Sequence, residues 1–349
     1  MMWVKPCPDF SPERPLFLCV LANTETAKIP GISAAGKSPE LTDFTPAADA
    51  ELVETGNAIS INEPAMTPSG VPTPAVLTRA SMLLTGIPSL FINSGLRVRP
   101  RIPTIDLDCQ PGGDMRKGHA VADAYDIYRK SQALGEKLGK LSDLVIIGES
   151  VPGGTTTAMG VLRALGYEGK VSSSFPKNPL SIKNEVVEEA MNRSNISFGS
   201  LRDRPLDAVE CLGDPMMAAV AGLVDGIGQK IVLAGGTQMV SVLGVIKHLG
   251  LERDVSIATT CFVDEDKSAN FREMTHILGY QAYAADPGFG RSRRKGLAMY
   301  ENGDVKEGVG AGGAMFAAAM MGFSQKEFRE KTEEVCDNIF GDGIQKTAD

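Results

Sequence analysis

Short apolar runs alternate along this chain with longer stretches whose apolar residues recur at helical spacing. The apolar runs predict strands at Leu16–Leu21, Ser89–Ile92, Leu144–Ile147, Lys230–Leu233, Ser256–Thr260 and Gln281–Ala284. The longer stretches predict helices at Ala120–Leu138, Thr156–Leu165, Ile182–Met191, Pro215–Asp225, Met239–Leu249 and Ala269–Leu278. Strands that alternate with helices of this length are typical of a mostly parallel sheet. We therefore expect an α/β fold with a Rossmann-like sheet and helices on both of its faces.

The segment from Asn23 to Pro88 departs from this alternation, because it is rich in Pro, Thr, Ser, Ala and Gly. Its composition predicts long loops with one helix near Ala75–Leu84. Long loops in a compact domain usually border a binding site. A linker is the alternative, and the alternating apolar residues of the segment argue against it.

The last predicted element is a helix from Ser324 to Phe340. Ser324 is a good N-cap, and Glu327 stands at the position that completes a capping box. Its apolar residues form a narrow stripe at helical spacing: Phe328, Val335, Ile339 and Phe340. Such a stripe fits packing within the chain as well as an interface between two chains.

Composition and charge narrow the range of functions. A chain of 349 residues with 43% hydrophobic and 22% charged residues suits one large domain, or a domain with a smaller companion. A net charge of −8 argues against binding to nucleic acid or to an anionic membrane. The basic cluster from Arg291 to Lys295 is the exception. We favour a solvated loop there, with a clamp for one small anion as the alternative.

The cysteines and histidines give no sign of a metal or cofactor site. The six cysteines are scattered without paired spacing, and the three histidines lie far apart, so neither a disulfide framework nor metal catalysis is expected. The run Leu16–Leu21 is too short for a signal peptide, and no apolar run is long enough to span a bilayer. We expect a cytoplasmic protein without a cofactor.

An acidic residue stands directly before a glycine-rich turn and an apolar helix. Glu307 precedes Gly308, Gly310 and two further glycines, and an apolar helix is expected from Ala314 to Met321. Glycine allows the backbone to approach a ligand closely, and the first N–H groups of the helix would face that ligand. A carboxylate here would repel an anion but could take a proton from a neutral heterocycle. This combination predicts an enzyme that acts on a phosphorylated nucleotide.

A second glycine turn follows the predicted strand at Leu144–Ile147. Gly153 and Gly154 permit close approach of the backbone, and Thr155 and Thr156 add hydroxyl groups at the start of a helix. We expect a phosphate-binding loop, because ligands of parallel α/β sheets bind where strands lead into helix N-termini. An ordinary N-cap at Thr155 is the alternative. The lysine of a P-loop is absent.

Two further turns are weaker candidates. One contains Gly236 and Thr237 and follows the strand at Lys230–Leu233, and the other starts a helix at Gly213-Asp214-Pro215. Junctions of this kind are common in the fold class, so topology alone would explain either of them.

Four segments together carry a resemblance to a known family. Gly148–Thr156 resembles the G-E-x-x-x-G-N-T-T motif of the nicotinate-nucleotide–dimethylbenzimidazole phosphoribosyltransferase (CobT) family. Gly213–Ala219 stands where that family has G-G-F-E-I-A-A, Ala285–Gly288 is similar to A-E-P-G, and Glu307–Ala311 resembles E-G-S-G-A. The motifs keep their order over about half of the chain. The chain as a whole looks most like a divergent, archaeal-type branch.

The resemblance implies a reaction and roles for the candidate residues. A nucleobase, dimethylbenzimidazole-like or purine, would displace nicotinate from nicotinate mononucleotide, giving the α-ribosyl nucleotide that is the lower ligand of a cobamide. Glu307 would take the proton of the attacking base, and Glu149 would orient the sugar or stabilise developing positive charge. The 5′-phosphate and the rest of the nucleotide would be held by the turns named above: Gly153, Gly154, Thr155, Thr156, Gly236, Thr237, Gly308 and Gly310.

The resemblance also implies a homodimer in which a small helical domain is built from the terminal regions. We expect an N-terminal region at 1–120, a large α/β domain at 121–322 and a C-terminal helix at 323–349. The motifs differ from the family at Gly154, where it has asparagine, at Val309, where it has serine, and at Asp214-Pro215. A nucleotide-binding protein without turnover is therefore the main alternative, and another glycosyl or phosphoryl transferase is a third.

Overall fold

One twisted sheet runs through the molecule. The computed structural model describes residues 3–33, 39–62, 64–67 and 69–341. Within these ranges the strands are β1 (Val4–Lys5), β2 (Pro15–Leu21), β3 (Ser89–Asn93), β4 (Ile105–Asp106), β5 (Leu144–Ser150), β6 (Lys230–Ala234), β7 (Val255–Thr260) and β8 (Gln281–Ala285). Their order is β1-β8-β7-β6-β5-β2-β3-β4, and every pair is parallel except β1 with β8. All six predicted strands are present, and the expected mostly parallel, Rossmann-like sheet is confirmed.

The strand order reverses between β2 and β5. From β2 the chain adds β3 and β4 on one side, and it then returns to place β5 on the other side of β2, followed outward by β6, β7 and β8. A reversal of this kind leaves a crevice beyond the carboxyl ends of the two central strands. Ligands of open α/β sheets bind in that crevice.

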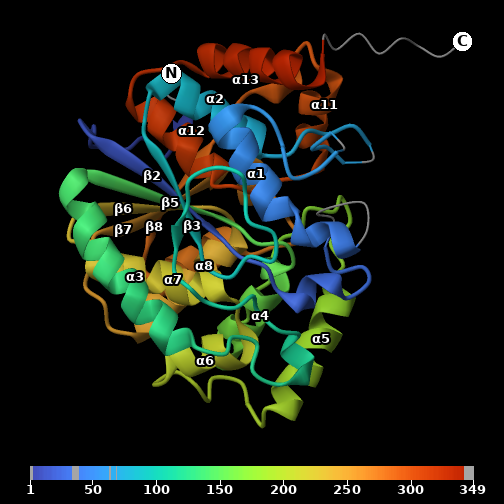
Figure 1. The fold of residues 1–349 in the computed structure, drawn as a ribbon, viewed down its shortest axis with the longest axis vertical. Helices are drawn as coiled ribbons and strands as arrows, with labels where there is room; N and C mark the ends of the chain where they lie inside the picture. The colour runs from blue at the N-terminus through green and yellow to red at the C-terminus, as the bar shows by residue number, and fades with distance from the viewer. Residues whose placement is uncertain (1–2, 34–38, 63, 68, 342–349) are drawn as a thin grey trace, which may run out of the picture.

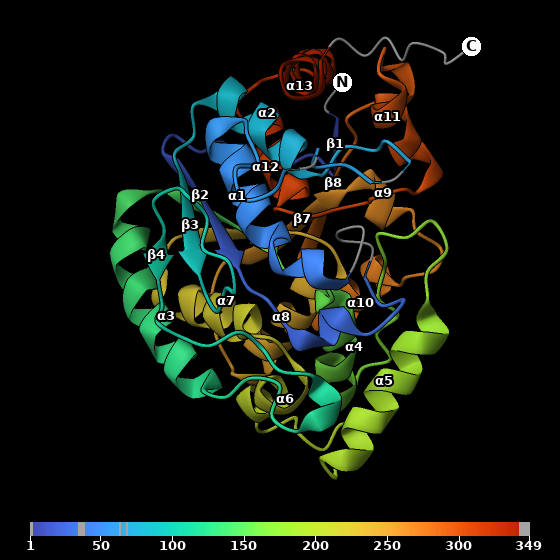
Figure 2. The ribbon, with the colours of Figure 1, turned by 45° about the vertical axis from the view of Figure 1, so that its right-hand side comes forward.

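Helices cover both faces of the sheet (Figure 1). One side carries α1 (Thr45–Thr55), α2 (Ala75–Thr85), α12 (Ala311–Met320) and α13 (Gln325–Phe340). The other side carries α3 (Ala124–Leu138), α4 (Gly154–Ala164), α5 (Leu180–Arg193), α6 (Pro205–Leu212), α7 (Pro215–Gly226), α8 (Thr237–His248) and α10 (Phe271–Leu278). The turned view in Figure 2 shows the same two layers, with the short helices α9 (Cys261–Asp264) and α11 (Lys295–Ala298) near β8.

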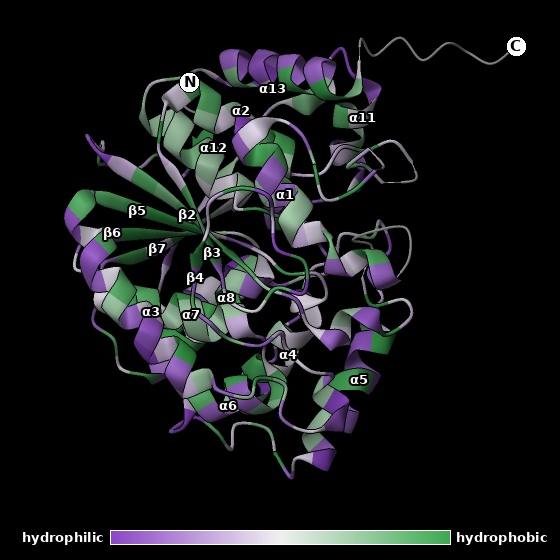
Figure 3. Ribbon diagram, in the orientation of Figure 1, coloured by the Kyte–Doolittle hydropathy of each residue, from purple (hydrophilic) through white to green (hydrophobic). Residues whose placement is uncertain are grey.

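Each face of the sheet packs into its own apolar core. Along β5, Val145 and Ile147 lie in the core beneath α4, α7 and α8, whereas Leu144 and Ile146 lie in the core beneath α2 and α12. A parallel strand covered on both faces is apolar at consecutive positions, which explains the continuous runs in the sequence. Figure 3 shows the central strands as strongly hydrophobic and α13 as largely hydrophilic along its outer side.

The segment from Asn23 to Pro88 contains a second helix, α1, so the expectation of a single helix there is wrong. Proline in the first turn and Gly56 in a left-handed conformation after the last turn mark its two ends. Asp49 and Glu51 are buried along with its apolar residues. The helix therefore lacks the amphipathic pattern from which helices are predicted.

The C-terminal helix α13 is tied to the N-terminus of the chain. The predicted capping box is present: the Glu327 amide donates to Ser324 Oγ at 3.2 Å, and the Ser324 amide donates to Glu327 Oε2 at 2.8 Å. Phe328 is buried and stacks on Trp3 with ring centroids 5.1 Å apart. The stripe of α13 thus packs within the chain. Positions 342–349 of the expected C-terminal domain lie outside the described residues.

The proposed division at residues 120 and 322 stays a prediction, and the single sheet takes strands from both sides of residue 120. No helix within the described ranges is long and apolar enough to cross a membrane.

Candidate active site

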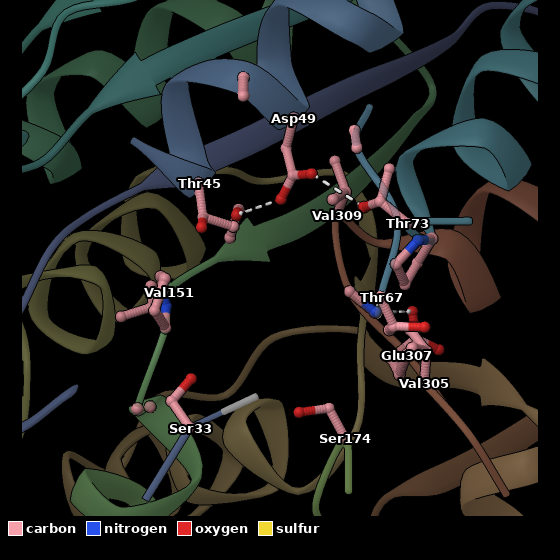
Figure 4. A pocket seen from close by; sticks show the side chains of 18 of the residues that line it. Ser33, Thr45, Asp49, Thr67, Thr73, Val151, Ser174, Val305, Glu307 and Val309 are labelled. Atoms are coloured by element: carbon pink, nitrogen blue, oxygen red, sulfur yellow. Dashed lines mark hydrogen bonds between the residues drawn. The ribbon is translucent and has the colours of Figure 1, made fainter. Parts of the chain in front are cut away.

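A pocket opens at the switch point between β2 and β5. Its volume is about 490 Å³. The carboxyl end of β5, the turns before α4 and α8, the Glu307 turn and the loops around α1 and α2 all contribute to its wall. The predicted site residues among its lining are Glu149, Gly153, Gly154, Thr155, Gly236, Thr237, Glu307 and Gly308. Residues far apart in sequence thus meet in one place, as Figure 4 shows for Val151, Val309 and Glu307.

The Glu307 carboxylate is half-buried and surrounded by hydrogen-bond donors. It accepts from the backbone amides of Thr260 at 3.0 Å, Gly312 at 3.1 Å and Gly308 at 3.2 Å, and from Thr259 Oγ1 at 3.3 Å. Burial nevertheless raises the pKa of Glu307 to about 7, because these bonds offset only part of the cost of desolvating the charge. A carboxylate with a pKa near neutrality is suited to general base catalysis.

The expected role of the helix after this turn is wrong. Helix α12 begins at Ala311 rather than Ala314, and its first-turn amide at Gly312 donates to Glu307 rather than facing a ligand. The helix dipole therefore stabilises the charge of the catalytic candidate itself. Gly310 packs against Gly148, and it is not among the described residues that line the pocket.

Glu149 lies on β5 near its carboxyl end and is buried. Its Oε2 atom accepts a hydrogen bond from Gln238 Nε2 at 3.0 Å. Burial, reinforced by the nearby carboxylates of Asp214 and Glu307, raises the pKa of Glu149 to about 8. Two interacting acids with raised pKa values at one pocket are a mark of a functional site.

Strand β5, which carries Glu149, and the turn that carries Glu307 touch through their backbones. The Val309 amide donates to the Glu149 carbonyl oxygen at 2.9 Å. A Cβ atom on Gly148 would lie 2.8 Å from the Cα of Gly310, so neither position has room for a side chain. Val309 has a φ of +55°, which is strained for a β-branched residue. Strain of this kind persists where the surroundings fix the backbone, often at functional sites.

The expected phosphate loop stays a prediction, and the structure gives the geometry of the turn before α4. Gly153, with a φ of +78°, is the N-cap of α4 and no side chain caps this helix, so the alternative of Thr155 as N-cap is wrong. Thr155 lines the pocket. Thr156 is buried, and in the described part of the chain its hydroxyl has neither a hydrogen-bond partner nor a place in the pocket wall.

The side chain of Gln238 fills the space in front of Gly154. A Cβ atom on Gly154 would lie within 2.1 Å of Gln238 Nε2. An amide group from the start of α8 therefore lies beside Gly154, the position at which this sequence lacks the asparagine of the CobT motif. The sequence contained Gln238 in the third glycine turn, but spacing gave no sign that it would reach the second turn.

Two buried lysines near the pocket were not predicted from the sequence. Lys306 is buried, and its Nζ atom donates to the carbonyl oxygens of Ser173 at 2.8 Å and Phe175 at 3.3 Å, with Asp266 Oδ2 at 3.3 Å. Lys306 and Ser172–Ser174 line the pocket. Lys183 donates to the Ser172 carbonyl oxygen at 2.7 Å, and burial lowers its pKa to about 7. The run of three serines was the available signal.

Two buried aspartates extend the acidic part of the site. Asp49 of α1 lines the pocket, and burial raises its pKa to about 6. Asp214 lies behind the phosphate loop, where it accepts from Thr157 Oγ1 at 2.6 Å, and burial raises its pKa to about 6 as well. Asp49 was missed because its helix was missed.

The basic cluster at 291–295 binds the protein itself. Arg293 Nε donates to Glu333 Oε2 at 3.0 Å, and both Arg293 and Arg294 pair with Asp337. The cluster is largely exposed, as expected for a solvated loop, and Arg293 and Arg294 pair with α13 rather than forming a clamp for an anion. Among the described residues, no three His, Cys, Asp or Glu side chains lie close enough together to hold a metal ion.

Fold and site together define a Rossmann-type α/β protein whose pocket lies at the topological switch point. No family model matches the chain. A UPF0284 protein of Methanosarcina mazei is 55% identical over 342 residues, covering 96% of this chain and 98% of that protein. A UPF0284 protein of Thermococcus gammatolerans is 48% identical over 325 residues, covering 92% and 97%. The chain therefore belongs to the UPF0284 family.

Solved structures support the predicted resemblance at the level of the fold. The nicotinate-nucleotide–dimethylbenzimidazole phosphoribosyltransferase of Thermus thermophilus matches with a TM-score of 0.59 and 16% identity, over 95% of this chain and 86% of that chain. A second structure, of CobT from the same organism, matches with a TM-score of 0.59 and 15% identity over 94% and 86%. The fold expected from the resemblance is confirmed, and the UPF0284 relatives named above come from archaea.

Proposed function

We propose that this protein is a phosphoribosyltransferase that moves the ribose 5-phosphate of nicotinate mononucleotide onto a nucleobase. The product would be the α-ribosyl nucleotide used as the lower ligand of a cobamide. The observation that carries the proposal is the separation of charge along one pocket. Asp49, Glu149 and Glu307 line one part, and Lys306 lies with Ser172–Ser174 at another. Nicotinate mononucleotide carries the complementary pair, a pyridinium cation and a phosphate anion.

The phosphate would lie between the starts of two helices. Gly153, Gly154 and Thr155 bring the N-terminus of α4 to the pocket, and Gly236 and Thr237 bring that of α8. Helix N-termini favour phosphate because their first amides lack internal partners. Lys306, whose charge is partly offset by Asp266 Oδ2 at 3.3 Å, and the serine loop add further polar groups on the same side.

In the transfer step, a ring nitrogen of the base attacks the anomeric carbon with its lone pair. The bond from that carbon to the pyridinium nitrogen breaks, and nicotinate leaves with the electron pair. The proton on the attacking ring passes to Glu307. Glu149 stabilises the positive charge that develops on the ribose. Neither the displacement of nicotinate nor the proton transfer to Glu307 needs a metal or a redox cofactor.

The proposal is tested by incubating the full chain with nicotinate mononucleotide and a nucleobase and measuring released nicotinate. Base-dependent release, with formation of the ribosylated base, is the expected result. Release without a base would identify a nucleosidase and would contradict transfer.

A nucleotide-binding protein without turnover is the alternative, because Glu307 accepts four hydrogen bonds and could serve as a helix cap alone. Binding of nicotinate mononucleotide without release under any of these conditions would favour it. A homodimer and a cytoplasmic location are part of the proposal.

A further inference from the structure

One part of the pocket is made by α1 and by the loops that flank α2. Phe44, Ala48, Met66 and Pro74 give it apolar walls. In Figure 4, Asp49 lies at the top of the pocket, Ser174 at the bottom and Glu307 at the right-hand wall. The walls suit a flat aromatic ring, and the ring would have the proton acceptor Glu307 at its edge. We name this part, lined by Phe44, Thr45, Asp49, Met66 and Thr73, the acceptor part.

The polar atom that dominates the acceptor part is a carboxylate. Asp49 is only 6% exposed. Ser150 Oγ donates to its Oδ2 atom and Thr73 Oγ1 donates to its Oδ1 atom, both at 2.9 Å. Each carboxylate oxygen can accept about two hydrogen bonds, so each keeps one free lone pair. Because the hydroxyl protons of Ser150 and Thr73 are donated to Asp49, these two groups can only accept a hydrogen bond from a ligand.

Two further hydroxyls of the pocket lining donate to groups of the protein. Thr45 Oγ1 donates to the Leu41 carbonyl oxygen at 3.3 Å, and Ser60 Oγ donates to Glu51 Oε1 at 2.6 Å. Both face the pocket with lone pairs alone. The hydroxyls of Ser150 and Thr73, which contact Asp49, therefore offer a ligand only acceptor atoms beside the carboxylate.

We infer that Asp49 determines which base is used, and that the acceptor is a fused-ring heterocycle with an N–H or O–H donor on its six-membered ring. This inference rests on the proposed function. A donor on the ring pairs with the free lone pairs of the carboxylate. A ring that carries only methyl groups would displace water from Asp49 without donating a hydrogen bond in its place. Desolvating a buried charge in this way costs binding free energy.

The experiment compares four bases with the full chain and nicotinate mononucleotide. Adenine offers an amino donor and 5-hydroxybenzimidazole a hydroxyl donor, whereas benzimidazole and 5,6-dimethylbenzimidazole offer none on the six-membered ring. The kcat/KM of at least one donor-bearing base should exceed that of 5,6-dimethylbenzimidazole about tenfold or more, the size expected for a hydrogen bond to a charged group. Comparing the first two bases separates an amino from a hydroxyl donor. Equal rates, or a preference for the methylated base, would overturn the inference.

The variant Asp49→Asn keeps the shape of the side chain and removes its charge. The ratio of kcat/KM between the preferred base and 5,6-dimethylbenzimidazole should fall at least tenfold. Asp143→Asn is the matched control, because Asp143 accepts from the amides of Glu13 and Arg14 before the start of β5, far from the pocket. Its ratio should equal that of the parent. An unchanged ratio in Asp49→Asn would assign Asp49 a structural role only.

Calorimetric binding of each base to the protein separates the two proposals. If no base gives transfer, the proposed function fails, and tighter binding of a donor-bearing base that is lost in Asp49→Asn would still support the role of Asp49. If transfer occurs without a donor preference, the function stands and the inference falls. Absence of both transfer and base binding would overturn both. If Asp49→Asn does not fold, the ranking of the four bases with the parent protein decides.

Discussion

The folded protein disfavours the ionised form of Glu307, because the carboxylate is partly removed from water. Burial raises its pKa from 4.5 to about 7 in spite of four donors. A carboxyl group with a raised pKa in the folded state stabilises the protein fully below about 4.5, and this contribution is lost as the pH rises through about 7. Catalysis depends on the opposite form, because only the ionised carboxylate can accept a proton.

The variant Glu307→Gln should lose turnover by roughly a hundred- to ten-thousand-fold, the contribution of a well-placed general base. The kcat/KM of the parent should fall as the pH drops from about 8 through about 7, the range set by the coupled pair Glu149 and Glu307. The residual activity of the variant should not follow this profile. Circular dichroism and a melting curve check its fold, and activity within a few-fold of the parent would exclude Glu307 as the base.

Thr155 and Thr156 are neighbours with opposite environments, and they form a natural pair of variants. Thr155→Val should weaken the binding of nicotinate mononucleotide, because Thr155 lines the pocket. Thr156→Val should leave binding unchanged and raise the free energy of unfolding by about 1 kcal/mol, because it removes a buried hydroxyl for which the described residues offer no partner. Thermal shifts with and without the nucleotide measure both effects. The reverse pattern would place the phosphate contact at Thr156.

At the scale of elements, α13 is held by ion pairs at one side and by an aromatic stack at the other. Glu333 has a side chain only 8% exposed and accepts from Ser292 Oγ at 2.7 Å and from the Arg293 amide at 3.0 Å. The partner elements are short turns, so these bonds connect the helix to the region after β8.

Replacing Glu333 with alanine should lower the free energy of unfolding by about 1–3 kcal/mol, since Ser292 Oγ, the Arg293 amide and Arg293 Nε lose their charged partner. Glu330→Ala is the matched control on the same helix. Its pair with Lys326 spans 3.7 Å between exposed side chains and should contribute less than about 0.5 kcal/mol. Urea unfolding of both variants measures the difference, and equal effects would show that the arginine cluster does not anchor α13.

The elements that could be predicted are those with a clear period or a clear cap. The strands were recognisable because both faces of the sheet are covered, and α13 because of Ser324 and Glu327. Helix α1 could not be predicted, since it buries Asp49 and Glu51 along with its apolar residues. Glu307 and Glu149 could be singled out from glycine turns. Lys306, Gln238 and Asp49 could not, because their roles depend on contacts between distant loops.

At the scale of the whole molecule, the expected homodimer is a prediction that surface residues allow to be tested. Leu83 on α2 is 52% exposed, on the same side of the sheet as α13. Single exposed apolar side chains are normal on a protein surface, so Leu83 is chosen for its place on the side of the sheet that carries the terminal helix. Light scattering should give a dimer for the parent, and Leu83→Glu should convert it to a monomer. Ile277→Glu on α10, at an equally exposed position, is the control. A monomeric parent would refute the dimer.

The close contact between Gly148 and Gly310 makes the site sensitive to substitution at two positions that have no catalytic group. A single methyl group at either position would force β5 and the Glu307 turn apart. Every carboxylate, amide and hydroxyl of the site would still be present. Such a variant would keep all the residues by which an enzyme is recognised, yet its two acids would no longer share one geometry. An inventory of catalytic side chains in a relative therefore has to include these two positions, which carry no side chain at all.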